Sequence, residues 1–121
     1  MVKADLHLHS KYSNISPEWF LQRLGVQESY TELEALYVLA KRRGMSFVTV
    51  TDHDCIEGAE RLHAMYPRDT FVSVETTTRF PEDNCKVHLL IYGISRAQFE
   101  HVSQIRQNIY LLRDYVRAEQ L

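Results

Sequence analysis

Near its start the chain reads Asp5-Leu6-His7-Leu8-His9, an alternation of polar and apolar side chains. Because successive side chains of a strand point to opposite faces, this alternation predicts a strand over residues 3–9 with one polar face. His7 and His9 then share that face, and Asp5 lies one step behind them. Two imidazoles on one face can chelate a single metal ion. The stretch therefore predicts both the first strand of a sheet and the first part of a metal site.

Two further strands are predicted downstream. Residues 47–51 are β-branched and aromatic, and they run directly into the polar residues Asp52, His53 and Asp54. Residues 71–75 have the same character and end at Glu75. Each predicted strand thus delivers a polar side chain at its carboxyl end.

Helices are predicted between these strands. A short helical segment is expected over residues 16–24, and a longer helix is expected to begin at the capping-box pair Thr31 and Glu34 and to end before Gly44. A third helix is expected over residues 59–66. The order of strand, helix, strand, helix and strand indicates an α/β fold.

The last third of the chain predicts a hairpin followed by one helix. The strand at residues 71–75 is expected to pair with an apolar strand at residues 87–92. Ser95 and Gln98 then form a capping box, and an apolar stripe continues almost to Leu121 in what we expect to be a single helix. Residues 1–121 therefore form one predicted α/β domain.

The carboxyl ends of parallel strands form one rim, where ligands bind. His88 lies in an apolar strand, where a buried polar group needs a partner. Taken singly, each of these polar residues could be a hydrogen-bonded structural residue, and Asp52 or Asp54 could cap the following helix. As a set on one rim they favour a metal site. The predicted ligands are His7, His9, His53, Glu75 and His88.

A mixed shell of imidazole and carboxylate suits zinc, manganese or iron, and a glutamate between two ions can bridge them. Closely spaced ions generate hydroxide from bound water and stabilise charge on a phosphoryl group. The expected reaction is hydrolysis of a phosphate ester, with Asp52 and Glu75 as the catalytic residues. Asp5 and Asp52 are further expected to orient imidazole rings.

Four sequence motifs in this order resemble the polymerase and histidinol phosphatase (PHP) domain. They are Asp5-Leu6-His7-Leu8-His9-Ser10, Thr51-Asp52-His53-Asp54, Glu75 and Val87-His88-Leu89-Leu90. The resemblance implies a distorted (β/α)7 barrel that holds up to three ions of zinc, manganese or iron, with Glu75 as the bridging ligand. It is strongest to the stand-alone metal-dependent phosphoesterases of bacteria, which implies a hydrolase.

The sequence departs from that family in two places. Asn14 stands about where related phosphoesterases carry an aspartate or a histidine, so the resemblance makes it a sixth, neutral and weaker candidate ligand. The family's later ligands, a histidine and an Asp-x-His motif, have no counterpart in these 121 residues. Because a barrel of this kind needs roughly 200 residues, we expect the chain to be the N-terminal half of a PHP domain, truncated at its C-terminus.

Composition bears on partners. The 14 basic and 16 acidic residues are scattered and give a net charge of −2, so nucleic acid is not an expected partner. No apolar stretch approaches the roughly 20 residues of a membrane span, and a cytoplasmic protein is expected. The expected substrate is a phosphorylated small molecule or a nucleotide. The uncovered edge of a half barrel favours a homodimer.

A second interpretation stays open from the sequence. The chain could be a non-catalytic metal-binding module that supports a partner or another domain, because the later ligands of the family are missing. Turnover of a phosphate ester distinguishes the two interpretations, since both predict bound metal.

Overall fold

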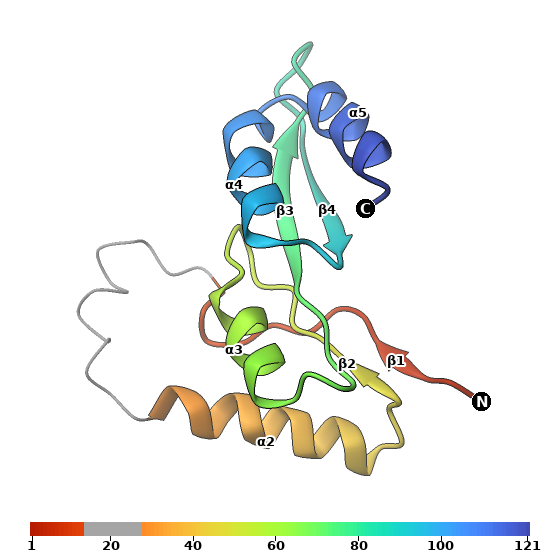
Figure 1. The fold of residues 1–121 in the computed structure, drawn as a ribbon. Coiled ribbons are helices and arrows are strands. Elements are labelled where there is room, and N and C mark those ends of the chain that lie inside the picture. Colours follow the sequence, from red (N-terminus) through yellow and green to blue (C-terminus); the bar gives the residue numbers. More distant parts are fainter. Residues whose placement is uncertain (14–27) are drawn as a thin grey trace.

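Helices separate the first strands of the chain, as the sequence predicts, and the fold is mixed α/β. The computed structural model describes residues 1–13 and 28–121 (Figure 1). In chain order the elements are β1 (Ala4–Asp5), α2 (Glu28–Arg42), β2 (Phe47–Val48), α3 (Glu57–Met65), β3 (Ser73–Arg79), β4 (Lys86–Tyr92), α4 (Arg96–Ile105) and α5 (Ile109–Glu119).

The first sheet brings the two histidine-bearing segments together. β1 pairs in parallel with β2, with Ala4 opposite Phe47. Beyond the formal strand ends, the amide of Thr51 donates a hydrogen bond to the carbonyl of Leu8 at 2.7 Å. A parallel bridge between His53 and Glu75 then connects this layer to β3. The predicted strands at residues 3–9 and 47–51 are therefore shorter than expected, because only their first residues form a regular ladder.

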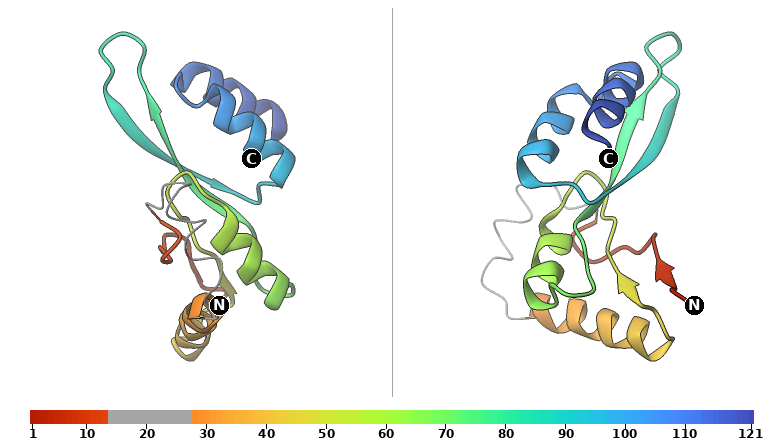
Figure 2. Two further views of the ribbon diagram at one scale, coloured as in Figure 1. Left: turned by 90° about the vertical axis from the view of Figure 1, so that its left-hand side faces the viewer. Right: turned by 45° about the vertical axis from the view of Figure 1, so that its right-hand side comes forward.

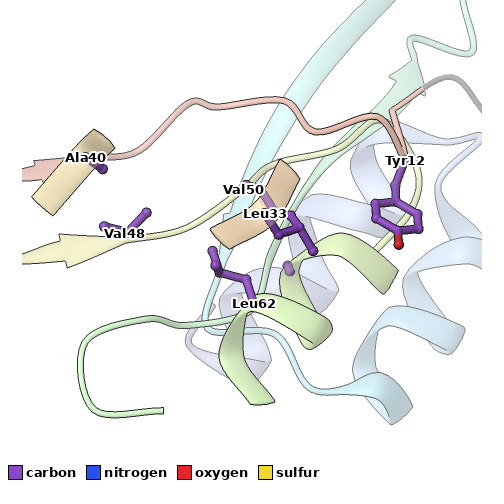
Figure 3. Packing of buried hydrophobic residues seen from close by; sticks show 7 residues of the cluster. Tyr12, Leu33, Ala40, Val48, Val50 and Leu62 are labelled. Carbon is purple, nitrogen blue, oxygen red and sulfur yellow. The ribbon is translucent and has the colours of Figure 1, made fainter. Parts of the chain in front are cut away.

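Helices α2 and α3 cover this sheet with a small apolar core. Leu33 of α2 and Leu62 of α3 are fully buried against Val50, which follows β2. Figure 3 shows these three side chains converging between the helices and the extended segments. Their packing fixes where the chain leaves β2 and so where His53 lies.

The second sheet is an antiparallel hairpin of β3 and β4, in which Thr77 lies opposite His88. Helices α4 and α5 lie beside this hairpin (Figure 2). Val74 of β3 packs with Val102 of α4 and Leu112 of α5 in a second apolar cluster. The predicted hairpin is confirmed, but β3 continues past Glu75 to Arg79 because pairing with β4 extends it. Glu75 is thus inside a strand rather than at its end.

The helix expected to begin at Thr31 starts earlier than predicted. α2 begins at Glu28, so Thr31 lies within the helix and cannot be its N-cap. It ends at Arg42, before Gly44, whose φ of +82° suits a glycine terminator. The helix expected over residues 16–24 lies outside the described residues.

The single helix expected after Ser95 is two helices. The capping box of Ser95 and Gln98 is present, but α4 ends at Ile105 and α5 starts at Ile109. Asn108 adopts an extended conformation, and its side chain accepts hydrogen bonds from the amides of the next turn. An apolar stripe continues across such a break, which is why periodicity missed it.

Among the described helices, none combines the length and the apolar character that crossing a bilayer requires.

Candidate metal centre

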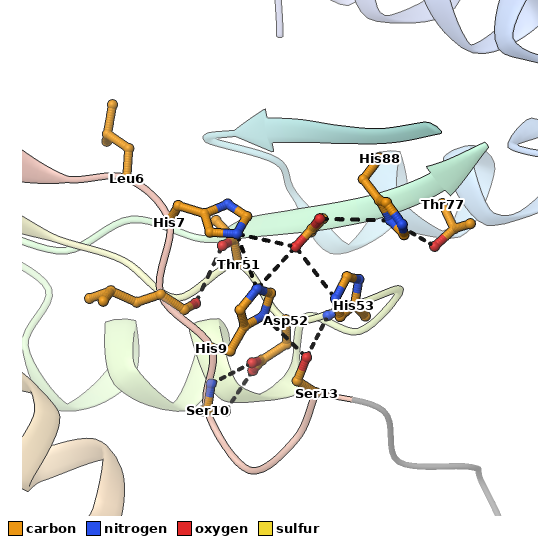
Figure 4. A network of polar contacts seen from close by, with 12 residues as sticks. Leu6, His7, His9, Ser10, Ser13, Thr51, Asp52, His53, Thr77 and His88 are labelled. Carbon is orange, nitrogen blue, oxygen red and sulfur yellow. Dashed lines mark hydrogen bonds and ion pairs between the residues drawn. The ribbon is translucent and has the colours of Figure 1, made fainter. Parts of the chain in front are cut away.

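The structure brings the five histidine and glutamate residues of the predicted site together. His7 and His9 follow β1, His53 follows β2, Glu75 belongs to β3 and His88 to β4. Figure 4 shows the four imidazole rings turned toward one region. Two strands and two extended segments thus place their polar side chains at a common point.

Glu75 lies at the centre of this cluster. Its Oε2 atom is 3.1 Å from Nε2 of His9 and 3.6 Å from Nε2 of both His7 and His53. Its Oε1 atom is 3.7 Å from Nδ1 of His88. The five residues form two groups that share Glu75, one with His7 and His9 and one with His53 and His88.

These distances fit a metal ion better than direct hydrogen bonds. Two ligands that each lie about 2.1 Å from a tetrahedral ion are about 3.4 Å apart. The distances from Glu75 to the four rings, 3.1 to 3.7 Å, surround that value. Nε2 of His7 and Nε2 of His9 face each other at 3.2 Å, which also places two donor atoms around one point.

The burial of Glu75 also favours a bound metal ion. The residue is only 6% exposed, and Oε2 is enclosed without a hydrogen-bond partner among the described residues. A buried carboxylate without such partners is costly unless a cation compensates it. A divalent ion between Glu75 and the imidazoles would provide that compensation, so the donor set fits a metal.

Ser13 supports two of the rings and was not identified from the sequence. Its Oγ atom lies 3.1 Å from Nδ1 of His9 and accepts a hydrogen bond from the amide of His53 at 3.2 Å. The contact to Nδ1 leaves Nε2 of His9 directed at Glu75. A serine four positions after a histidine carries no sequence signal of this role, because the contact depends on a turn that periodicity does not reveal.

Asp52 acts on the backbone next to the site. Its two carboxylate oxygens accept hydrogen bonds from the amide and the hydroxyl of Ser10, both at 2.6 Å. Burial raises the pKa of Asp52, and the bonds from Ser10 oppose that rise. Asp52 therefore fixes the turn that follows His9, whereas we expected it to orient an imidazole ring. Asp5 likewise accepts from the amide of His7, at 3.4 Å.

The site is open on one side. The side chains of His7 and His88 are 51% and 49% exposed, whereas Glu75 lies beneath them. The hydroxyl oxygen of Thr77, Oγ1, lies 3.4 Å from Nδ1 of His88. A ligand could therefore reach the cluster from the face that carries His7 and His88. The sixth candidate ligand, Asn14, lies outside the described residues.

Comparisons with known proteins identify one partial relative. No family model matches the chain. An uncharacterized protein of Methanocaldococcus jannaschii, MJ1587, is 40% identical over 57 residues, which is 47% of this chain and 32% of that protein. The match therefore spans about a third of the relative's length. Fold and site together define a mixed α/β chain with a cluster of histidines and a glutamate that could hold metal.

Proposed function

We propose that this chain belongs to a metal-dependent phosphoesterase of the PHP type and forms the N-terminal part of a distorted (β/α)7 barrel. One observation carries the proposal most directly. Glu75 is buried and shared between two groups of imidazoles. A shared carboxylate can bridge two closely spaced ions, which is the arrangement that hydrolytic sites use on phosphate esters.

The ligand chemistry favours zinc, manganese or iron. Imidazole nitrogen and carboxylate oxygen suit these ions, whereas magnesium and calcium prefer oxygen alone. The two groups would hold two ions, with His7 and His9 on one side of Glu75 and His53 and His88 on the other. A third ion would need ligands beyond these two groups.

The chain's own residues would divide the work between binding and positioning. When bound, the ions would lower the pKa of water and offset negative charge on a phosphoryl group. Glu75 would hold both ions, and Asp52 would keep the His9 turn in place through Ser10. The exposed rings of His7 and His88 would flank the phosphate of a small phosphorylated molecule or a nucleotide.

Hydrolysis of aryl phosphates tests this proposal. The protein is freed of metal, reloaded with manganese, zinc or iron, and assayed with p-nitrophenyl phosphate and its diester. We expect metal-dependent release of nitrophenol that His9→Ala lowers at least 100-fold. His101→Ala is the matched control, because His101 lies in α4 and its ring packs at a tilt against Tyr115, outside the cluster. Equal activity in both variants would contradict the proposal.

A non-catalytic metal-binding module is the second candidate. Within the described site Glu75 is the carboxylate that both groups use, and the two oxygens of Asp52 are already engaged by Ser10. A group that transfers protons is therefore not evident there. Full metal loading without turnover on either substrate would favour this module over the enzyme.

A further inference from the structure

Arg106, at the junction of α4 and α5, reaches two residues next to the candidate metal ligands. It is the C-cap residue of α4, and Nη1 of its side chain lies 3.0 Å from Oδ2 of Asp54. The same nitrogen donates a hydrogen bond to the carbonyl of Thr77 at 3.1 Å. Arg106 and Asp54 are both partly buried. One guanidinium thus contacts two different segments of the site.

Asp54 has an unusual conformation that needs support. It follows His53 directly and has a φ of +51°, in the left-handed region that non-glycine residues rarely adopt. Its amide donates to the carbonyl of Glu75 at 2.9 Å, and its Oδ1 accepts from the amide of Thr77 at 2.8 Å. Surrounding contacts must hold such a conformation in place. The ion pair with Arg106 is the charged contact among them.

Thr77 links the Arg106 contact to two further candidate ligands, Glu75 and His88. It lies two positions after Glu75 on the same face of β3, and it is the cross-strand neighbour of His88. Its hydroxyl also approaches Nδ1 of that histidine. The two segments that Arg106 contacts therefore carry His53 and Glu75, and the second of them pairs with the strand of His88, the third member of that group.

We propose that Arg106 is a positioning residue for His53 and His88, the two ligands that one metal group does not share with the other. The inference rests on the proposed function, since it assumes that this group binds an ion. His9, in the other group, has a support that does not involve Arg106, because Asp52 fixes the turn after His9 through Ser10. Loss of the Arg106 side chain should therefore weaken one ion and spare the other.

The test measures each ion separately. Calorimetric titration of the metal-free protein with zinc gives the two dissociation constants, and His7→Ala and His88→Ala assign each step to its group. We expect Arg106→Met to raise the Kd of the ion held by His53 and His88 about 10- to 100-fold, as removal of an outer-shell partner of a metal ligand typically does. The Kd of the other ion should stay within about twofold of the parent value.

Arg96 supplies a matched control. It lies on the same helix, α4, and pairs with Glu57 and Glu60 of α3, away from the cluster. Arg96→Met should leave both dissociation constants unchanged. Arg106→Lys keeps the positive charge but loses the planar guanidinium. It should therefore raise the Kd of the ion held by His53 and His88 only about three- to tenfold.

The outcomes separate this inference from the proposed function. Two ions bound by Arg106→Met as tightly as by the parent, or both ions weakened equally, would overturn the positioning role. Should Arg106→Met fail to fold, Arg106→Lys decides by the same two criteria. A parent protein that binds no ion would instead overturn the proposed function and the inference with it.

Discussion

Oε2 of Glu75 lies 3.1 Å from Nε2 of His9, yet no hydrogen bond joins the two atoms in the described part of the chain. Both atoms carry lone pairs when the imidazole is neutral and its proton is on Nδ1, and Ser13 lies within reach of Nδ1. In that tautomer the two atoms are facing acceptors, and they repel each other. A cation between them would turn that repulsion into attraction, which makes Glu75 the residue whose charge most affects metal binding.

Replacement of Glu75 by glutamine should abolish tight binding of both ions. The amide keeps the shape of the side chain but removes the negative charge that the two groups share, so we expect each Kd to rise at least 100-fold. Because an uncompensated buried carboxylate is costly, the metal-free variant should be as stable as the parent or more so. Metal titration and urea denaturation of the metal-free proteins check both parts. Glu60→Gln, which alters an exposed ion pair with Arg96, should change neither Kd.

Gly58→Ala should destabilise the protein although it lies in a helix. A Cβ at this position of α3 would be 2.5 Å from Oδ2 of Asp52 and 2.8 Å from Oγ of Ser10. Both atoms are held in a buried hydrogen-bonded pair and cannot move freely. Alanine gains about 1 kcal/mol in helix propensity, but overpacking costs about 1–3 kcal/mol. Urea denaturation should show a net loss, and a variant more stable than the parent would contradict this close contact.

The same substitution should also weaken metal binding. Displacement of Asp52 moves Ser10, and Ser10 directly follows His9. We expect the ion held by His7 and His9 to be affected more than the ion held by His53 and His88. A stability loss with both dissociation constants unchanged would show that the Asp52–Ser10 pair supports the fold alone.

Strand periodicity was sufficient to predict which histidines and glutamate cluster, but not the residues that support them. The alternation around His7 and His9 places both rings on one face, and the convergence of strand ends predicted that His53 and Glu75 would meet them. Ser13 and Arg106 were missed because their contacts depend on loop conformations and on the break at Asn108. Those features arise from tertiary packing, which leaves no periodic signal in the residues themselves.

Asp69→Asn should lower stability at neutral pH but not in acid. Lys41 and Tyr37 of α2 both bond the Asp69 carboxylate, with Nζ of Lys41 at 2.7 Å from Oδ2. The hydrogen bond from Lys41 is the main cause that lowers the pKa of Asp69 below its ordinary value. A carboxyl whose pKa is lower in the folded state stabilises the fold above the unfolded value of about 3.9. That stabilisation is lost as the pH falls through the lower folded-state pKa.

We therefore expect the variant to be about 1 kcal/mol less stable than the parent at pH 7, with the difference vanishing below the folded-state pKa. Thermal unfolding of both proteins, measured from pH 7 to pH 2, checks whether their stabilities converge in acid. Asp114→Asn, at an exposed aspartate that pairs with its neighbour Arg113, should track the parent throughout. Stability curves of the parent and Asp69→Asn that coincide from pH 7 to pH 2 would show that the ion pair contributes nothing.

Substitution by valine at two buried threonines should change the stability of the protein in opposite directions. Thr76 is fully buried on the face of β3 that carries Val74, and its hydroxyl has no hydrogen-bond partner among the described residues. Thr49 is equally buried, but its hydroxyl donates to the carbonyl of Phe71 at 2.6 Å and lies 3.0 Å from Oγ of Ser73. Valine has nearly the same shape as threonine, so the two substitutions differ mainly in the hydrogen bonding that is removed.

Thr76→Val removes a buried polar atom that gains nothing in the folded state, and we expect the protein to become about 1 kcal/mol more stable. Thr49→Val removes a hydrogen bond and leaves the carbonyl of Phe71 without this donor, so we expect a loss of about 1–2 kcal/mol. Urea denaturation of the metal-free proteins measures both changes in the free energy of unfolding. A loss of similar size in both variants would mean that the Thr76 hydroxyl is bonded in solution.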